Sequence, residues 1–599
     1  MSMMTPHPLK PKSRKISWDN NYPYSIDYED RFFQSDAIAE TEEVFLRANN
    51  LSDRWKKDKS KNFTIGELGF GFGLNFLITA KNWHQQTSKE SKKWLDYISI
   101  DSFALNIEDF QRVTKDFPEL KEFSQMFIDS FPIEINGYTR ISYPKYRIRL
   151  TLIVDDVDSA LQSLLGNDNN KIDAWYLDGF DPKKNTNMWS DDIFSKISAL
   201  SKNNTTFGTY TAAGFVRRGL EKHNFKVDKV KGFKNKRHKL QGIFSQEKKY
   251  CKNQYPSKVA IIGAGIAGSC LAFNLAKNNI EVDVFDKNIE LNANPMASMY
   301  PKFSFGVDPR SYLLVQGYFH SFNFYIENLN SFSNTGILFL NNNAERDFWI
   351  KRIAKLNRDD LFKYLSAEEI NSKNNINQKF NGILIKYGAN ISINELNNKL
   401  LKNKKINVFK NHEFVKYEQD SSIKAIFKEA KEYEGYSHLV ICSGESLQEI
   451  VPRIGIKYGA IAGIDDKSLK NIKYPINADG YILPKHKNVN WTGSIYSDKA
   501  LSKDVPLDFE SIIVKNSYLL KHKNVRDIKE SWIGTRATLP DYLPMAGALE
   551  DKIYAIGGLG SRGLSLAPLL AEVIMCDICN IPSPISKNIK EAINPLRFI

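Results

Sequence analysis

The chain has 599 residues, a net charge of +14 and an apolar fraction of 42%. This length predicts two or three domains rather than one core, and the apolar fraction excludes wholesale disorder. No apolar run is long enough to span a bilayer and residues 1–15 contain no apolar signal segment, so we expect neither a membrane protein nor a secreted one.

A glycine-rich turn follows the first predicted strand, within residues 63–76. Its ExGxGxG spacing is formed by Glu67, Gly69, Gly71 and Gly73. Glycines at such a turn let the backbone fold closely beneath a ligand. The spacing favours S-adenosylmethionine over a dinucleotide, since this ligand has no phosphate to bind. We therefore predict a cofactor site in a Rossmann-like methyltransferase domain.

Acidic residues end the next two predicted strands, residues 97–100 and 150–154. Asp101 ends the first and is the expected partner of the ribose hydroxyls. Asp155 and Asp156 end the second, where a side chain would contact the adenine, and we favour Asp156. The carboxyl ends of strands face the ligand crevice in sheets of this kind, which supports both assignments.

The predicted strand 174–177 ends on Asp178. A carboxylate at that edge can accept a proton from an amine and orient its lone pair, so Asp178 is the candidate catalytic residue of this half. Capping of the following turn is the alternative. With a further strand at residues 206–210, alternation with helical stretches predicts a mostly parallel α/β sheet.

Positive charge is concentrated between residues 201 and 250, which carry 13 basic and 3 acidic side chains. Residues 1–200, in contrast, carry 26 basic and 30 acidic side chains. The densest part is the segment 217–239. Clustered Lys and Arg side chains are typical of a phosphate-backbone contact, and a solvated basic face is the alternative.

A polar stretch without apolar periodicity, residues 245–257, is the predicted linker. We place the boundary near Tyr250, which gives domains at residues 1–250 and 251–599.

A second glycine turn follows the apolar strand 259–262. Gly263, Gly265 and Gly268 form GxGxxG, which brings a pyrophosphate to the N-terminus of the next helix. The following strand ends at Asp286, where an acid accepts hydrogen bonds from the adenosine ribose. These features predict a dinucleotide-binding Rossmann domain.

The end of this half favours FAD over NAD. Residues 554–568 read as a strand that enters a glycine turn and a helix, with Gly558 and Gly560 in the turn. A second helix N-terminus of this kind can stabilise the electron-rich end of a reduced flavin. Mixed short strands between the two glycine turns predict an α+β substrate subdomain.

The five cysteines are too few and scattered for a disulfide framework, which favours a reducing cytoplasm. Cys576 and Cys579 form a CxxC inside an apolar run with no second ligand pair nearby. We therefore favour core packing over metal or redox chemistry, and expect no metal site.

Residues 532–547 and 558–569 resemble the D-amino-acid oxidase and glycine/sarcosine oxidase superfamily. Within it, they are most similar to enzymes that remove a carboxymethyl group from an amine on a tRNA wobble uridine. Arg536 and Arg562 match family arginines, which implies contact with the substrate carboxylate. Structural ion pairs are the alternative.

Two segments depart from the pattern of that family. The glycine-bearing loop before a Tyr-Pro pair is shortened to residues 296–301, and Asn390 replaces a family tryptophan.

The N-terminal half resembles the methyltransferase half of the same enzymes, at residues 30–46, 177–189 and 210–220. Asp181 stands where this family has a small residue. Over residues 16–245 and 256–575 the chain thus resembles the bifunctional enzymes of 5-methylaminomethyl-2-thiouridine biosynthesis in tRNA.

The resemblance implies two consecutive reactions. FAD-dependent oxidation removes the carboxymethyl group, and S-adenosylmethionine then methylates the amine that remains. We also expect a monomer, and the basic segment 217–239 is the candidate for binding the anticodon arm. A small-molecule glycine/sarcosine-type amine oxidase fused to a small-amine methyltransferase is the alternative, and a non-catalytic tRNA-binding module is a third reading.

Overall fold

The computed structural model describes residues 6–19, 22–33, 36–57, 60–87, 92–234, 236–246, 255–290, 293–329, 332, 334–501, 508–520 and 528–598. The chain divides into two compact units. The first comprises Met1–Tyr255, Phe305–Tyr312 and Cys579–Glu591, and the second comprises Pro256–Ser304, Leu313–Ile578 and Ala592–Ile599. The predicted boundary near Tyr250 lies outside the described residues.

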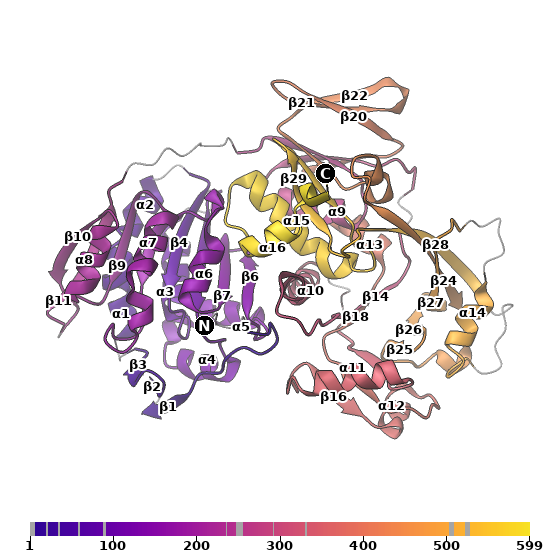
Figure 1. Cartoon of the computed structure of the whole chain (residues 1–599), viewed down its shortest axis with the longest axis horizontal. Coiled ribbons are helices and arrows are strands. Elements are labelled where there is room, and N and C mark those ends of the chain that lie inside the picture. Colours follow the sequence, from indigo (N-terminus) through magenta and orange to yellow (C-terminus); the bar gives the residue numbers. More distant parts are fainter. Residues whose placement is uncertain are drawn as a thin grey trace. The chain divides into compact units, whose positions relative to one another are not determined.

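An eight-stranded sheet forms the centre of the first unit, in the order β10-β11-β9-β8-β4-β5-β7-β6 (Figure 1). Its bounds are β4 Asn62–Leu68, β5 Trp94–Asp101, β6 Gly137–Tyr143, β7 Ile148–Val154, β8 Ile172–Leu177, β9 Ser201–Thr209, β10 Phe225–Lys231 and β11 His238–Phe244. The five strands from β9 to β7 in this order are parallel to one another, and the remaining three pair antiparallel at the edges. The predicted mostly parallel α/β sheet is confirmed.

Helices cover this sheet, and its two faces bury separate apolar clusters. Tyr97 and Tyr176 belong to one cluster, whereas their neighbours Ile98 and Trp175 belong to the other. This is the alternation expected of strands buried on both faces. The helices are α1 Ala37–Thr41, α2 Leu51–Lys57, α3 Leu74–Gln86, α4 Ile107–Thr114, α5 Lys121–Asp129, α6 Val157–Leu164, α7 Asp191–Leu200 and α8 Gly214–Lys222.

Near its N-terminus the first unit adds a small three-stranded sheet and a π-helix. The strands are β1 Ile16–Asp19, β2 Tyr22–Ser25 and β3 Asp30–Arg31, and the π-helix Glu42–Arg47 continues from α1.

The segment Cys579–Glu591, near the end of the chain, packs in the first unit. Arg140 donates a hydrogen bond of 2.5 Å to the carbonyl of Pro582. The Ser583 amide donates to the Asn170 side chain at 3.0 Å. These contacts join parts of the sequence more than 400 residues apart, and no local pattern predicts them.

The second unit contains the dinucleotide-type sheet, in the order β19-β13-β12-β23-β30-β29. Its strands are β12 Lys258–Ile262, β13 Glu281–Phe285, β19 Ile406–Phe409, β23 His438–Ile441, β29 Met545–Glu550 and β30 Ile553–Gly557. All pairings are parallel except that of β29 with β30. The helices α9 Ile266–Lys277 and α15 Gly563–Cys579 begin at the two predicted glycine turns.

A second, mixed sheet of eight strands forms the expected α+β subdomain, in the order β16-β17-β15-β25-β26-β27-β24-β28. Its strands are β15 Ile337–Leu340, β16 Phe362–Leu365, β17 Gly382–Ile385, β24 Gly455–Ile464, β25 Ile476–Asn477, β26 Tyr481–His486, β27 Val489–Ser497 and β28 Ile528–Thr538. The other elements of this unit are β14 Ala297–Met299, β18 Ala389–Ile391, β20 Phe414–Gln419, β21 Ile423–Phe427, β22 Lys431–Tyr436, α10 Pro309–Asn328, α11 Ala344–Ala354, α12 Ala367–Asn374, α13 Ile393–Leu400, α14 Phe509–Lys515 and α16 Lys587–Ala592, the last shared with the first unit.

The CxxC cysteines lie at the end of α15, where both are buried, as core packing predicts. In the described part of the chain, no group of three or more His, Cys, Asp and Glu side chains is arranged to hold a metal ion. The same part contains no helix with the length and apolar character needed to cross a membrane.

Candidate active sites

A cavity of about 520 Å³ opens at the carboxyl ends of β4, β5 and β8 in the first unit. Three of the predicted residues that line it are Gly69, Asp101 and Asp178. A Cβ atom added to Gly69, which has φ of +87°, would lie 3.4 Å from the backbone of Gly179. The glycine turn therefore passes directly against the end of β8, and its backbone borders the cavity at Gly69 and Gly71.

Asp101 faces the glycine turn. Its carboxylate accepts a hydrogen bond from the Gly71 amide at 3.0 Å and pairs with Arg14 at 2.6 Å. Arg14 also donates to the Gly71 carbonyl at 2.6 Å. Arg14 lies before all of the sequence motifs described above. Only the fold shows that it stabilises the glycine turn. The ribose contact of Asp101 stays a prediction.

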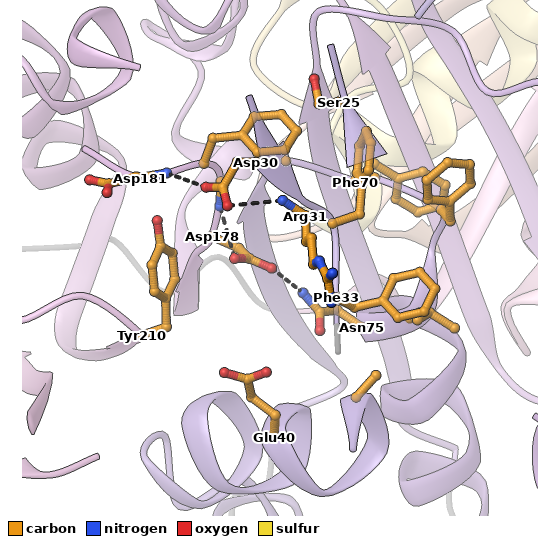
Figure 2. A pocket seen from close by; sticks show the side chains of 18 of the residues that line it. Ser25, Asp30, Arg31, Phe33, Glu40, Phe70, Asn75, Asp178, Asp181 and Tyr210 are labelled. Atoms are coloured by element: carbon orange, nitrogen blue, oxygen red, sulfur yellow. Dashed lines mark hydrogen bonds between the residues drawn. The ribbon is translucent and has the colours of Figure 1, made fainter. Parts of the chain in front are cut away.

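Asp178 lies at the centre of a polar network in this cavity (Figure 2). Its Oδ2 accepts a hydrogen bond from Asn75 at 2.8 Å, and its Oδ1 accepts one from the Gly179 amide at 2.9 Å. The Thr41 hydroxyl in turn donates to the side-chain Oδ1 of Asn75 at 2.7 Å. Burial raises the pKa of Asp178 to about 6, against the opposing effect of these donors. Asp178 thus contacts the following turn and also faces the cavity.

Glu67 is the acid of the predicted ExGxGxG turn, and its role in cofactor binding stays a prediction. It is fully buried within the sheet and is absent from the residues that line the cavity. Its Oε2 accepts a hydrogen bond of 2.6 Å from Ser99. Burial raises the pKa of Glu67 to about 8, so the group is mostly protonated at neutral pH. Its geometry is that of a residue beneath the site rather than one in contact with a ligand.

Asp156 caps a helix. Its carboxylate accepts a hydrogen bond from the Ser159 amide at 3.0 Å at the start of α6. Neither Asp156 nor Asp155 is among the residues that line the cavity. An acid directly before a helix satisfies free N–H groups, and this competes with a role in ligand binding.

Aromatic rings form another wall of the cavity, and no periodic pattern in the sequence predicts them. Phe180 stacks on Tyr28 with a centroid distance of 4.6 Å, and Phe32 meets Phe180 edge-on at 5.1 Å. Other aromatic residues in the wall are Phe33, Phe70, Phe72 and Tyr210. Flat apolar surfaces of this kind suit a stacked base.

The second unit contains a cavity of about 560 Å³ beside the other two glycine turns. It is lined by Gly265, Gly558, Gly560, Arg536 and Arg562, all five of them predicted site residues. These residues come from loops after β12 and β30 and from strand β28, almost three hundred residues apart in sequence.

The first glycine turn of this cavity fits a pyrophosphate. A Cβ atom added to Gly268 would lie 1.9 Å from the Gly263 carbonyl, so helix and strand touch there. One added to Gly265 would meet no protein atom within 4 Å, so the backbone at Gly265 borders open space. Asp286 accepts hydrogen bonds from the Ala264 amide at 2.8 Å and from Asn288 at 2.9 Å, which holds the turn. Its ribose contact stays a prediction.

The two arginines face the cavity from different elements. Arg562 donates a hydrogen bond of 2.7 Å to the Tyr542 carbonyl. Arg536 lies over the ring of Tyr496, 4.7 Å from its centroid, and its buried Nη1 has no hydrogen-bond partner within the described structure. A buried donor without a partner is costly, which favours a ligand over a structural ion pair for Arg536.

The two departures from the family pattern lie next to each other. Ser298, in the shortened loop, pairs with Asn390 where β14 and β18 run antiparallel. The Ser298 hydroxyl and the Asn390 Oδ1 are both buried without a hydrogen-bond partner in the described part of the chain. Ser298 also lines the cavity, so the departures alter one edge of this site.

Several cations of the basic segment are already paired. Lys236 binds Glu40 at 2.8 Å, Lys239 binds Glu43 at 3.1 Å and Lys222 binds Asp191 at 2.9 Å; Lys234 pairs with Asp36. The edge strand β10 carries three exposed lysines, Lys226, Lys229 and Lys231. Among the described residues, neither these lysines nor the exposed Arg237 form an ion pair. One residue of the segment 217–239, Asn235, lies outside the described residues. The segment 217–239 is thus a smaller positive surface than its composition suggests.

A family model described as FAD dependent oxidoreductase matches residues 258–576, more than half of the chain. The chain belongs to this family. A second model, described as S-adenosyl-L-methionine-dependent methyltransferase, matches residues 118–245. The chain therefore carries a domain of each kind, and both predicted cofactors, FAD and S-adenosylmethionine, are confirmed.

Relatives of this FAD-dependent oxidoreductase match nearly the whole of the chain. It is 27% identical over 96% of its length to a tRNA 5-methylaminomethyl-2-thiouridine biosynthesis bifunctional protein of Pseudoalteromonas atlantica, and covers 97% of that protein. It is 28% identical over 98% of its length to the protein of the same name from Legionella pneumophila, again covering 97%. A solved structure, glycine oxidase from Geobacillus kaustophilus, is 17% identical with a TM-score of 0.47 and covers 54% of this chain and 95% of its own.

Proposed function

We propose that this chain is a bifunctional tRNA-modifying enzyme that acts twice on the side chain of a wobble uridine. It first removes the carboxymethyl group from 5-carboxymethylaminomethyl-(2-thio)uridine, and then methylates the resulting aminomethyl group. The observation that carries the proposal is similarity to bifunctional tRNA-modifying proteins over nearly the whole of both chains. The two cavities support it, the first bordered by one predicted glycine turn and the second by two.

The oxidation site suits a substrate that carries a carboxylate. Arg536 and Arg562 would hold that carboxylate, and thereby fix the neighbouring carbon for loss of a hydride. The resulting substrate imine is hydrolysed to glyoxylate and a primary aminomethyl group. When bound, FAD accepts the electrons of this reaction, and S-adenosylmethionine supplies the methyl group of the next.

The methylation site has one carboxylate in position to act as a base. Asp178 accepts the proton that the amine loses, and its bond to Asn75 keeps the carboxylate oriented toward the cavity. Gly69, Gly71, Gly73 and Asp101 would form the donor side; Glu67 would support it from beneath the cavity lining, and Asp156 from the start of α6. On the flavin side the assigned residues are Gly263, Gly265, Gly268, Asp286, Gly558 and Gly560.

We assign methylation to residues 1–250 and oxidation to residues 251–599, in a cytoplasmic monomer. The unpaired cations of the segment 217–239 would bind the anticodon arm. Lysines that do not already pair with a carboxylate can neutralise RNA phosphates and release the counterions of those phosphates.

The test is mass spectrometry of wobble nucleosides after incubation of hypomodified tRNA with the purified chain. Without S-adenosylmethionine we expect aminomethyluridine to accumulate, and with it we expect methylaminomethyluridine. Free glycine and sarcosine serve as controls for the small-molecule alternative. Turnover of these amines with unchanged tRNA would contradict the proposal.

A further inference from the structure

Acidic side chains surround Asp178 in the methylation cavity. They are Asp30 from β3, Glu40 from α1 and Asp181 from the loop after β8, and we call these three the acidic rim. Figure 2 shows the rim, Asp178 and Tyr210 around one space. Burial raises the pKa of Tyr210, and the same four carboxylates raise it further, which places all of them near one hydroxyl.

The charge of the rim is only partly balanced. Glu40 pairs with Lys236 at 2.8 Å. Asp30 accepts a hydrogen bond from the Asp181 amide at 3.0 Å, and neither carboxylate forms an ion pair within the described structure. In the whole cavity lining, six acidic side chains outnumber three basic ones, and the basic Arg14 and Arg31 pair with Asp101 and Asp19.

The oxidation cavity has the opposite charge. Lys302 lies beside the two arginines, with its Nζ 3.4 Å from the Ser561 hydroxyl. Desolvation lowers the pKa of Lys302, and the positive charges of Arg562 and Arg536 lower it further, so the three cations are close together. The acid in this cavity lining, Glu445, pairs with Lys287 at 3.3 Å.

We propose that the acidic rim selects the methyl acceptor by charge, admitting the aminomethyl side chain and excluding its carboxymethylated precursor. This inference rests on the proposed function. Both side chains contain an amine that can be methylated: its lone pair forms the N–C bond as the donor's S–C bond breaks, and the nitrogen then loses a proton. Nucleophilicity alone therefore does not protect the precursor from methylation.

Charge distinguishes the two side chains. The precursor carries a carboxylate one carbon from its nitrogen, and in the cavity this group would lie among the carboxylates of the rim. Like charges at short range in a partly buried site repel strongly because screening is weak there. The aminomethyl group has only a positive charge before it loses its proton, and the rim attracts it. The same cavity thus enforces the order of the two reactions.

The test uses the full chain with Gly265→Asp, which we expect to prevent FAD binding, as loss of the flavin spectrum reports, so that the precursor is not oxidised during the assay. Two tRNA preparations, one with aminomethyluridine and one with carboxymethylaminomethyluridine, are incubated with S-adenosylmethionine. The methylated products differ in mass and are quantified separately. We expect the aminomethyl tRNA to react at least about a hundredfold faster, a magnitude typical of charge-based discrimination.

The double variant Asp30→Asn/Asp181→Asn removes two charges of the rim while it keeps the shape of the side chains. We expect its preference for aminomethyl tRNA to fall about tenfold or more, because methylation of the precursor increases. The matched control is Asp116→Asn/Asp168→Asn, which changes the net charge equally at two acids outside the cavity lining. Its preference should equal that of the parent.

An unchanged preference in the double variant would overturn the inference. Binding of S-adenosylmethionine, measured by calorimetry, shows whether the double variant folds. If it does not fold, Glu40→Gln provides a second measurement, and this variant should also lower the preference for aminomethyl tRNA. If the parent, the Gly265→Asp chain, methylates both tRNA preparations equally well, the inference alone is wrong. If the parent methylates neither tRNA, the proposed function is wrong and the inference with it.

Discussion

Replacement of Asp178 by Asn is the sharpest perturbation of the methylation site. The amide has the shape of the carboxylate, and its oxygen can still accept the hydrogen bond of 2.9 Å from the Gly179 amide. Its NH₂ group, however, would face the NH₂ group of Asn75 across a contact that is now 2.8 Å. Rotation of the Asn75 amide relieves this contact, because its oxygen then accepts from the new amide while its NH₂ group faces the Thr41 hydroxyl, which can accept instead of donate. The hydrogen bonds are rearranged rather than lost, so we expect a structural cost of at most about 1 kcal/mol.

The effect on catalysis should be larger than this structural cost. An amide cannot accept the proton of the amine, and loss of a general base typically lowers a rate by about 10²- to 10⁴-fold. We expect Asp178→Asn to bind S-adenosylmethionine and to remove the carboxymethyl group at the normal rate, so that aminomethyluridine accumulates. Mass spectrometry of the wobble nucleosides measures both steps in one sample, and the oxidation step is the internal control.

The pH profile of the unmodified chain provides an independent check. The Asp178 pKa of about 6 lies above the ordinary value chiefly because the group is buried. The carboxylate is ionised above this pH, so methylation should fall about tenfold per pH unit below it, in addition to the titration of the amine. Methylation by Asp178→Asn within tenfold of the parent, or no acid limb near pH 6, would refute the role of Asp178 as the base.

The two other predictions concern the glycine turn and the basic strand. Gly268→Ala places a Cβ atom 1.9 Å from the Gly263 carbonyl, so it should lower stability by about 1–3 kcal/mol and yield colourless protein, as measured by calorimetry and by the flavin spectrum. Gly265→Ala meets no protein atom, so the fold should be stable while FAD binds more weakly; full-strength FAD binding would contradict the assigned pyrophosphate position. Replacement of the unpaired Lys226, Lys229 and Lys231 by Ala should reduce the slope of log affinity for tRNA against log salt by about 2–3. A variant at the paired Lys222 and Lys234 should change it less, and equal effects would contradict the distinction.

The sequence predicted those parts of the sites that depend on strand order. Asp101 and Asp178 both end parallel strands, and parallel strands bring their carboxyl ends to one edge. The pairing of β4 with both β5 and β8 then places the two acids on either side of the glycine turn. The glycine turns follow the same logic, since a turn between a strand and a helix is a local feature.

Competing local roles account for two predicted acids, Asp156 and Glu67, that lie outside the cavity lining. Asp156 precedes a helix and caps it, and Glu67 ends up within the sheet because its strand is buried on both faces. An acid at a strand end has the same sequence signature in each of these roles. Only the positions of the neighbouring elements decide between a ligand contact, a helix cap and a buried polar group.

Contacts between distant segments could not be predicted at all. Lys236 and Glu40 are 196 residues apart, and their pairing depends on how α1 lies against the loop before β11. Arg14 reaches Asp101 across 87 residues. A count of charges along the chain cannot show such neutralisation, so the composition of the segment 217–239 overstated its free positive charge.

The net charge of +14 conceals two sites of opposite sign. The methylation cavity is lined mainly by carboxylates, and the oxidation cavity gathers Lys302, Arg536 and Arg562. Each sign matches the side chain that is proposed to react there: a carboxylate where the carboxymethyl group is removed, and an amine where a methyl group is added. Because oxidation converts a side chain that carries a carboxylate into one that carries only an amine, it also converts a ligand of the cationic cavity into a ligand of the acidic one. The order of the reactions then follows from local electrostatics within each cavity and needs no contact between the two.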